Sequence, residues 1–163
     1  MINNIADKQY KMIVDYILED KEFNKIGKSV HHGTDRLEHS IKVSYYSYLI
    51  SKKLGLDYET TARAGLLHDY FLTDNDKKIK DSAKSLFNHA KIASSNAVEN
   101  FNISEKEKSI IETHMFPINI KPPKYLEGWV ISFVDKALAV SEVSVKFKYT
   151  AVLWLLFLIN IRK

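Results

Sequence analysis

Residues that interrupt helices are rare in this chain. It has five glycines and three prolines in 163 residues. Its apolar residues recur at helical spacing between short polar joints, and no segment shows the alternation of a strand or an internal repeat. We therefore expect an all-α fold, a helical bundle formed by a single domain of ordinary size.

Periodicity and capping residues predict where the helices begin and end. Asp35 with Glu38, and Ser104 with Glu107, have the spacing of capping boxes. Asp57 is placed to cap the start of a helix, and Gly55 to stop one. The expected helices cover about residues 5–18, 35–54, 57–70, 81–87, 89–101, 104–114 and 126–163. Along the second of these helices, the expected apolar face includes Val43, Tyr46, Leu49 and Ile50.

One apolar run, Ala151 to Ile161, is similar in composition to a membrane segment. The 13 residues between Lys148 and Arg162 would span about 20 Å as a helix, less than the roughly 30 Å of a bilayer core. We therefore expect no transmembrane segment. A buried C-terminal helix or an oligomer contact is the expected role, which makes a homodimer a candidate assembly, and an interfacial anchor is the alternative.

Charge and cysteine content limit the classes of partner. The net charge of +4 is small and scattered, without an arginine-rich run, so we expect no nucleic-acid binding and a preference for small anionic ligands. The absence of cysteine excludes disulfides and thiolate metal sites. Without a basic start followed by an apolar run, the N-terminus predicts no signal peptide, and a cytoplasmic protein is expected.

Several polar residues occur where the helical segments are otherwise apolar. Taken singly, each such histidine is well explained as a hydrogen-bonded core residue, and Asp135 as a capping residue or a partner of Lys136. Taken together, on five separate helices, they would all be satisfied by shared metal ions, because burying them unpaired costs several kcal/mol. Imidazole and carboxylate suit Fe, Mn, Zn or Co, and six ligands are enough for two divalent ions. The six residues are His39, His68, Asp69, His89, His114 and Asp135.

The order of these six residues resembles the HD-domain metal-dependent phosphohydrolase superfamily, in the pattern H…HD…H…H…D of its dinuclear members. The local sequences EHSIKV at 38–43, AGLLHD at 64–69 and VDK at 134–136 agree with it. The resemblance covers roughly residues 30–145. The expected division is therefore an N-terminal helical segment at 1–29, an HD domain at 30–145 and an apolar C-terminal helix at 146–163.

The resemblance implies a role for each residue. His39, His68, Asp69 and Asp135 would hold a first metal, and Asp69 would bridge to a second metal completed by His89 and His114. The implied activity is hydrolysis of a phosphate ester or anhydride of a small molecule, with a nucleotide as the expected substrate and a metal-activated water as the nucleophile. Iron, manganese or zinc would each fit.

Nearby charges are candidates for binding the phosphate. Arg36 lies three residues before His39 and could reach a phosphate with its guanidinium, although a surface arginine explains it equally well. Lys136 could steer an anion because the family often has lysine after the last aspartate. Arg63 is expected to form a structural salt bridge instead.

Two departures from the family pattern bear on the substrate. Tyr70 and Phe71 follow His68-Asp69 where cyclic-dinucleotide phosphodiesterases continue HDIGK, and Met115 follows His114 where those enzymes tend to have a second histidine. Both differences count against that substrate class. Two other hypotheses stay open: a di-iron HD-fold oxygenase, and a non-catalytic metal- or nucleotide-binding regulatory module.

Overall fold

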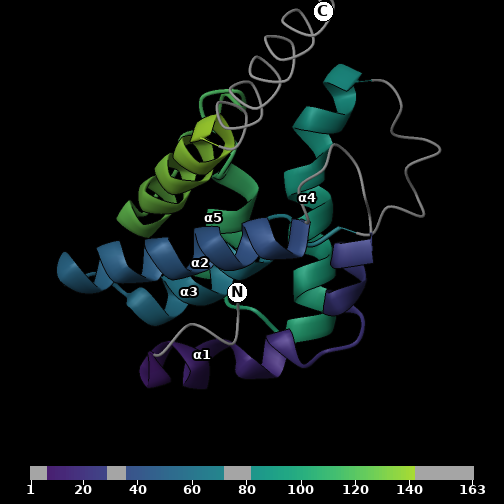
Figure 1. The fold of residues 1–163 in the computed structure, drawn as a ribbon. Coiled ribbons are helices and arrows are strands. Elements are labelled where there is room, and N and C mark those ends of the chain that lie inside the picture. Colours follow the sequence, from purple (N-terminus) through teal and green to yellow (C-terminus); the bar gives the residue numbers. More distant parts are fainter. Residues whose placement is uncertain (1–6, 29–35, 72–81, 142–163) are drawn as a thin grey trace, which may run out of the picture.

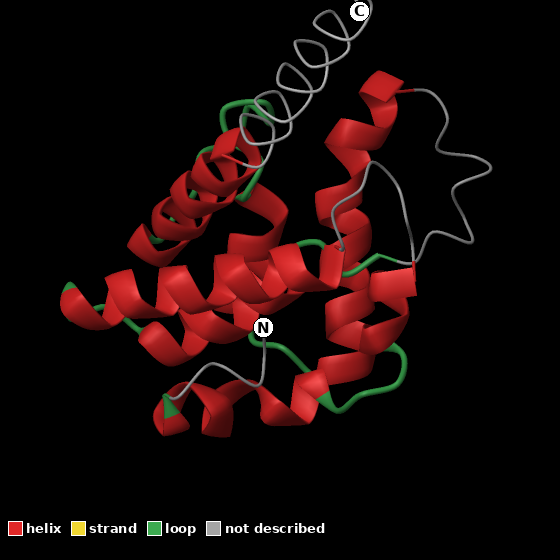
Figure 2. Ribbon diagram, in the orientation of Figure 1, coloured by secondary structure: helices red, strands yellow, loops and turns green. Residues whose placement is uncertain are grey.

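The computed structural model describes residues 7–28, 36–71 and 82–141. These residues contain no strand (Figure 2), which confirms the predicted all-α fold. The helices are α1 (Lys8–Leu18), the 3-10 helix η2 (Phe23–Lys28), α2 (Arg36–Lys53), α3 (Tyr58–Leu67), α4 (Ser82–Phe101), α5 (Glu105–Thr113) and a helix formed by residues 126–141 (Figure 1).

The helix ends follow the capping residues that the sequence indicated. The side chain of Asp57 accepts a hydrogen bond from the backbone N–H of Thr60 at the start of α3. Ser104 and Glu107 form the predicted capping box of α5. Gly55, just beyond α2, has a φ of 68°, a left-handed conformation that glycine adopts without a Cβ clash. The cap of the second helix, expected at Asp35, lies outside the described residues.

The pair formed by α2 and α3 lies at the centre of the bundle, with α1 on one side and helix 126–141 on the other (Figure 1). Of the four residues predicted on the buried face of α2, Val43 is buried, but the prediction was wrong for Tyr46, Leu49 and Ile50, which are exposed. The side that faces α3 instead carries a run of buried serines: Ser40, Ser44, Ser47 and Ser51.

Small side chains explain why this side of α2 faces α3. A Cβ added at Gly65 of α3 would lie 3.0 Å from the Cα of Ser44, so the two backbones are in close contact. The hydroxyl of Ser44 donates to the carbonyl of Ala62 and accepts from the hydroxyl of Tyr10. We call these four buried serines the serine face of α2. The serine face buries little apolar surface, but its small side chains allow a short distance between α2 and α3.

The segment predicted as two helices, 81–87 and 89–101, is one continuous helix, α4 (Ser82–Phe101). No glycine or proline lies inside it, so nothing in the backbone requires a break at Asn88. The buried face of α4 includes Ala93, Ala97 and Phe101, whereas Val98 of the same helix is exposed.

Helix 126–141 packs on the core through Ile131, Val134 and Leu138. No helix in the described part of the chain has the length and apolar character needed to cross a membrane. Residues 142–163 lie outside the described residues, so the apolar C-terminal helix and the three-part division of the chain stay predictions.

Replacing Gly65 with alanine should destabilise the fold. The new Cβ would meet the backbone of Ser44, so the helices would have to move apart, at a typical cost of about 1–3 kcal/mol. The gain in helix propensity is only about 1 kcal/mol. We expect the free energy of unfolding to fall by about 1 kcal/mol in urea titrations. Ser95→Ala, at an exposed position of α4, should change it little, and a Gly65→Ala variant as stable as the parent would contradict the close contact.

Candidate metal centre

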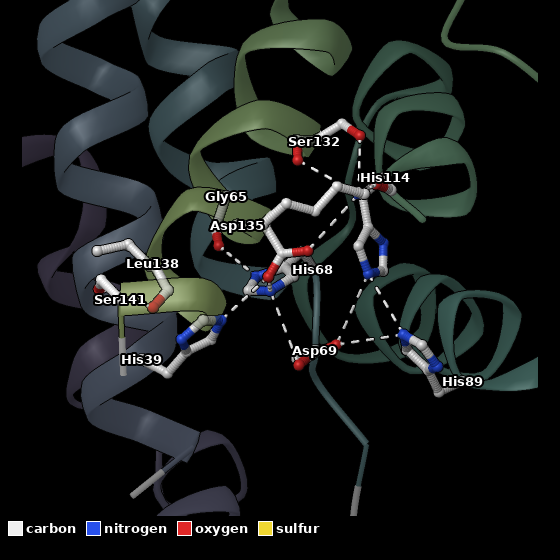
Figure 3. Close-up of polar contacts among 11 residues, drawn as sticks. His39, Gly65, His68, Asp69, His89, His114, Ser132, Asp135, Leu138 and Ser141 are labelled. Atoms are coloured by element: carbon white, nitrogen blue, oxygen red, sulfur yellow. Dashed lines mark hydrogen bonds and ion pairs between the residues drawn. The ribbon is translucent and has the colours of Figure 1, made fainter. Parts of the chain in front are cut away.

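Six polar side chains that are distant in the sequence meet at one place in the bundle (Figure 3). They come from five parts of the fold: α2, the end of α3, α4, the end of α5, and helix 126–141. All are at least three-quarters buried. They are the residues that the sequence singled out: His39, His68, Asp69, His89, His114 and Asp135.

His68 and His114 occupy equivalent positions at the C-caps of α3 and α5. Each ring turns back onto its own helix, where Nδ1 lies 2.8 Å from the carbonyl oxygen of Gly65 and 2.7 Å from that of Ile111, respectively. A carbonyl oxygen can only accept, so Nδ1 carries a proton in both histidines. Their Nε2 atoms therefore face the centre of the cluster, which is the orientation of many metal-bound histidines.

Asp135 connects the first two histidines. Its Oδ1 lies 3.1 Å from Nε2 of His39 and 3.7 Å from Nε2 of His68. The rings of His39 and His68 are 5.6 Å apart between centroids. Asp135 projects from the inner side of helix 126–141, between the core residues Val134 and Leu138. One carboxylate oxygen is thus shared by two imidazoles.

Asp69 lies between two sets of histidines. Its Oδ2 is 3.7 Å from Nε2 of His68, and its Oδ1 is 3.6 Å from Nε2 of His89 and 3.7 Å from Nε2 of His114. The Nε2 atoms of His89 and His114 are 3.3 Å apart. The two carboxylate oxygens therefore face different partners, as Figure 3 shows.

The electrostatics of the cluster show how strongly it attracts positive charge. Burial lowers the pKa of His68, but the carboxylates of Asp69 and Asp135 outweigh burial and raise it to about 9. Burial and the neighbouring charge of His68 lower the pKa of His114 to about 4. Burial raises the pKa of Asp69, but the charges of the surrounding imidazoles outweigh burial and lower it. Burial also raises the pKa of Asp135, but hydrogen bonds and charges from the imidazoles hold it well below its usual range.

The donor set fits a divalent metal. Nε2 of His68 and Oδ1 of Asp69 are buried without a hydrogen-bond partner, because the neighbouring donor and acceptor atoms lie 3.6–3.7 Å away. Bonds of about 2.1 Å to a metal put adjacent ligand atoms roughly 3.0–3.4 Å apart, close to the separations seen here. Three triplets of these residues have ligand atoms within 4.8 Å of one another: His39, His68 and Asp69; His68, His114 and Asp135; and Asp69, His89 and His114.

The basic residues take different positions around the cluster. Arg36 stacks on the ring of Phe71, with its Cζ 3.9 Å from the ring centroid, and donates to the carbonyl of Phe71. The ammonium of Lys136 donates to the carbonyl of His114 and to both oxygens of Ser132, and lies 3.9 Å from Oδ2 of Asp135. Arg63 forms an ion pair with Glu107 at 3.0 Å, as expected.

Two residues around the cluster, Phe71 and Ser132, were not identified from the sequence as parts of the site. Phe71 contacts Arg36 and also lies near the ring of His89, 5.7 Å between centroids. Ser132 donates to the carbonyl of Phe116 and, through Lys136, connects helix 126–141 to the loop after α5. The amphipathic pattern alone does not distinguish these residues from other core positions. The one sequence signal for their role is their position: Phe71 lies two residues after Asp69, and Ser132 three residues before Asp135.

The HD-domain family model matches residues 36–140. This range covers more than half of the chain, so the chain belongs to the HD-domain family. Members of this family bind divalent metals and are generally hydrolases. The matched range contains all six residues of the cluster.

Curated relatives match the chain over shorter stretches. A segment of 38 residues, 23% of this chain, is 53% identical to ribonuclease Y of Clostridium perfringens, strain SM101, and covers 7% of that protein. Ribonuclease Y of Clostridium tetani is 33% identical over 42% of this chain, which covers 16% of that protein. The chain thus corresponds to a small part of these relatives. No solved structure gives a significant match.

The metal-free protein should be most stable near pH 6.5. The raised pKa of His68, about 9, means that its contribution is present below 6.5 and is lost as the pH rises from 6.5 to 9. The lowered pKa of His114, about 4, means that its contribution is present above 6.5 and is lost as the pH falls from 6.5 to 4. Each slope is at most about 1.4 kcal/mol per pH unit.

Urea titrations in the presence of a chelator test this dependence. The variant His68→Gln should lose the fall above pH 6.5 and keep a smaller fall below it, because burial still lowers the pKa of His114 but the charge of His68 no longer does. A wild-type free energy of unfolding that stays level from pH 6.5 to 9 would contradict the proposed pairing of His68 with the carboxylates.

Proposed function

We propose that this chain is a metal-dependent phosphohydrolase that cleaves a phosphate ester or anhydride in a small molecule, with a nucleotide as its substrate. The observation that carries the proposal is the position of Asp69. Its two oxygens face two separate sets of imidazoles, 3.6–3.7 Å away. A carboxylate in this position is suited to bridging two cations, the arrangement that stabilises both the attacking and the leaving oxygen in phosphoryl displacement.

We assign the ligands to two divalent ions, with iron, manganese or zinc as candidates. His39, His68, Asp135 and one oxygen of Asp69 would hold the first ion, and His89, His114 and the other oxygen of Asp69 the second. When bound, such ions supply Lewis acidity and an activated water at neutral pH.

The protein's own residues would orient this chemistry. The carbonyls of Gly65 and Ile111 fix the rings of His68 and His114, so little rearrangement is needed when an ion binds. Arg36 sits one helical turn before His39 and is held against Phe71, where a planar guanidinium suits a phosphate. Lys136 bonds to the backbone of His114, which favours a role in positioning the ligands over direct contact with the substrate.

The comparisons bear on the substrate class. The matching relatives are named ribonucleases, and RNA is a chain of nucleotides joined by phosphodiesters. This supports a nucleotide phosphoester as the bond to be cleaved. The small and scattered positive charge of this chain, +4 in 163 residues, favours a small anion over a long nucleic acid.

The number of bound metal ions should depend on whether the ligands of both proposed ions are intact. Elemental analysis of protein purified without a histidine tag or chelator, then loaded with manganese, should give about two equivalents. His89→Ala should retain about one, because it removes a ligand of only one ion. The exposed control Ser95→Ala on the same helix should keep the wild-type value. No bound metal in the wild type after loading would contradict the proposal.

Hydrolysis should depend on the shared ligand. With manganese or iron, the wild type should release phosphate or cleave a phosphodiester in a screen of nucleoside phosphates, cyclic nucleotides and short RNA. The double variant His68→Ala/Asp69→Ala should fall to background, while Ser95→Ala keeps full activity. A double variant that hydrolyses as fast as the wild type would disprove the assignment.

The same preparation separates the two other hypotheses. Oxygen consumption by the ferrous form would favour the di-iron oxygenase. Tight nucleotide binding without turnover, across several metals, would favour the regulatory module.

A further inference from the structure

The half-buried ring of Phe71 contacts two groups of the site that come from different helices. The guanidinium of Arg36, from α2, stacks on the ring with its Cζ 3.9 Å from the ring centroid. The imidazole of His89, from α4, lies 5.7 Å away between centroids, at an interplanar angle of 41°. Phe71 also follows Asp69, the proposed bridging ligand, by two residues. One aromatic ring therefore lies against a metal ligand and a candidate phosphate-binding group at the same time.

The backbone of this segment is held from both sides. The N–H of Phe71 donates to the carbonyl of Asp69 at 2.9 Å. The carbonyl of Tyr70 accepts from the side-chain amide of Asn96 on α4 at 3.1 Å. The carbonyl of Phe71 accepts from Nη1 of Arg36 on α2, also at 3.1 Å. Since these bonds fix the chain at Phe71, its ring is in place before any ligand binds, which lowers the entropic cost of binding.

Arg36 carries a charge that the described part of the chain does not neutralise. Among the described residues no carboxylate pairs with its guanidinium, and the carbonyl of Phe71 is its one hydrogen-bond acceptor. Arg63 differs, because Glu107 neutralises it at 3.0 Å. A guanidinium has five N–H donors in a fixed plane. Stacking on Phe71 restrains that plane and leaves donors for an anion, and two parallel donors match two oxygens of a phosphate.

The contact with His89 has a consequence for the second ion. A group packed beside a ligand imidazole limits its rotation, in the way that hydrogen-bond partners outside the ligand set orient such rings. We propose that Phe71 is a positioning residue that holds His89 for the second ion and Arg36 for the phosphate of the substrate. The phosphate is then bound on the His89 side of the cluster. This inference rests on the proposed function, from which it takes the ion and the phosphate.

Binding of manganese and of inorganic phosphate tests the role of Phe71 without turnover. Phe71→Leu fills the space without a flat face. In titrations followed by the electron paramagnetic resonance signal of free manganese, it should weaken the second ion about 10-fold and leave the first within about twofold. It should also bind phosphate about 10-fold more weakly when loaded with manganese, because Arg36 loses its support. Phe71→Tyr keeps the ring and should restore both affinities. The matched control is Phe133→Leu, 71% exposed on helix 126–141, which should behave as the wild type.

Arg36→Gln separates the two effects of Phe71. It should weaken phosphate about 10-fold and leave both manganese affinities unchanged. If circular dichroism shows that Phe71→Leu has lost its helices, Phe71→Met carries the test with the same expected losses.

The possible outcomes distinguish this role from the proposed function. Wild-type affinities in Phe71→Leu, or an equal loss of both ions, would overturn the role of Phe71 and leave the proposed function standing. Wild-type phosphate affinity in Arg36→Gln would overturn it too. A wild type that binds two ions and phosphate but cleaves nothing in the substrate screen would contradict the hydrolysis and not the role of Phe71. A wild type that takes up no second ion would overturn both.

Discussion

The structure depends on keeping two carboxylates buried among four imidazoles. Buried ionised carboxylates are costly unless nearby positive charge compensates them. In the metal-free protein His68 supplies that charge, which is why its pKa rises to about 9 although burial opposes protonation. A divalent cation could replace the proton without moving the ligands far. The same field that holds a proton on His68 therefore makes the centre a strong site for metal.

The serine face of α2 makes this geometry possible. Ser44 and Gly65 are in close contact, so α2 and α3 approach closely and bring His39 to within 5.6 Å of His68, ring to ring. A larger side chain at either position would separate the helices and widen the cluster. At the ends of α3 and α5 the two C-capping histidines turn toward the same point. The close packing of α2 and α3 and the caps thus set the spacing of the ligands.

Much of the fold could be predicted from the sequence, because capping residues and scarce helix breakers act locally. Asp57 and the Ser104–Glu107 box mark helix starts that the structure confirms. Local sequence patterns failed where tertiary contacts determine which side of a helix is buried. In α2 the serine side is buried and Tyr46 is exposed, because small side chains let α3 approach closely. The six cluster residues stood out because polar side chains in apolar helices are expensive. Which backbone carbonyls orient them depends on the ring conformations at the caps, which no sequence pattern encodes.

The most direct test of the account is where metal ions sit in the crystallised protein. Crystals grown with manganese, measured at the manganese absorption edge, should show two anomalous peaks about 3.5–4 Å apart. One should lie among His39, His68 and Asp135, the other against His89 and His114, with one oxygen of Asp69 on each. A single peak that Asp69 does not touch, or none at all, would contradict the central role given to this carboxylate.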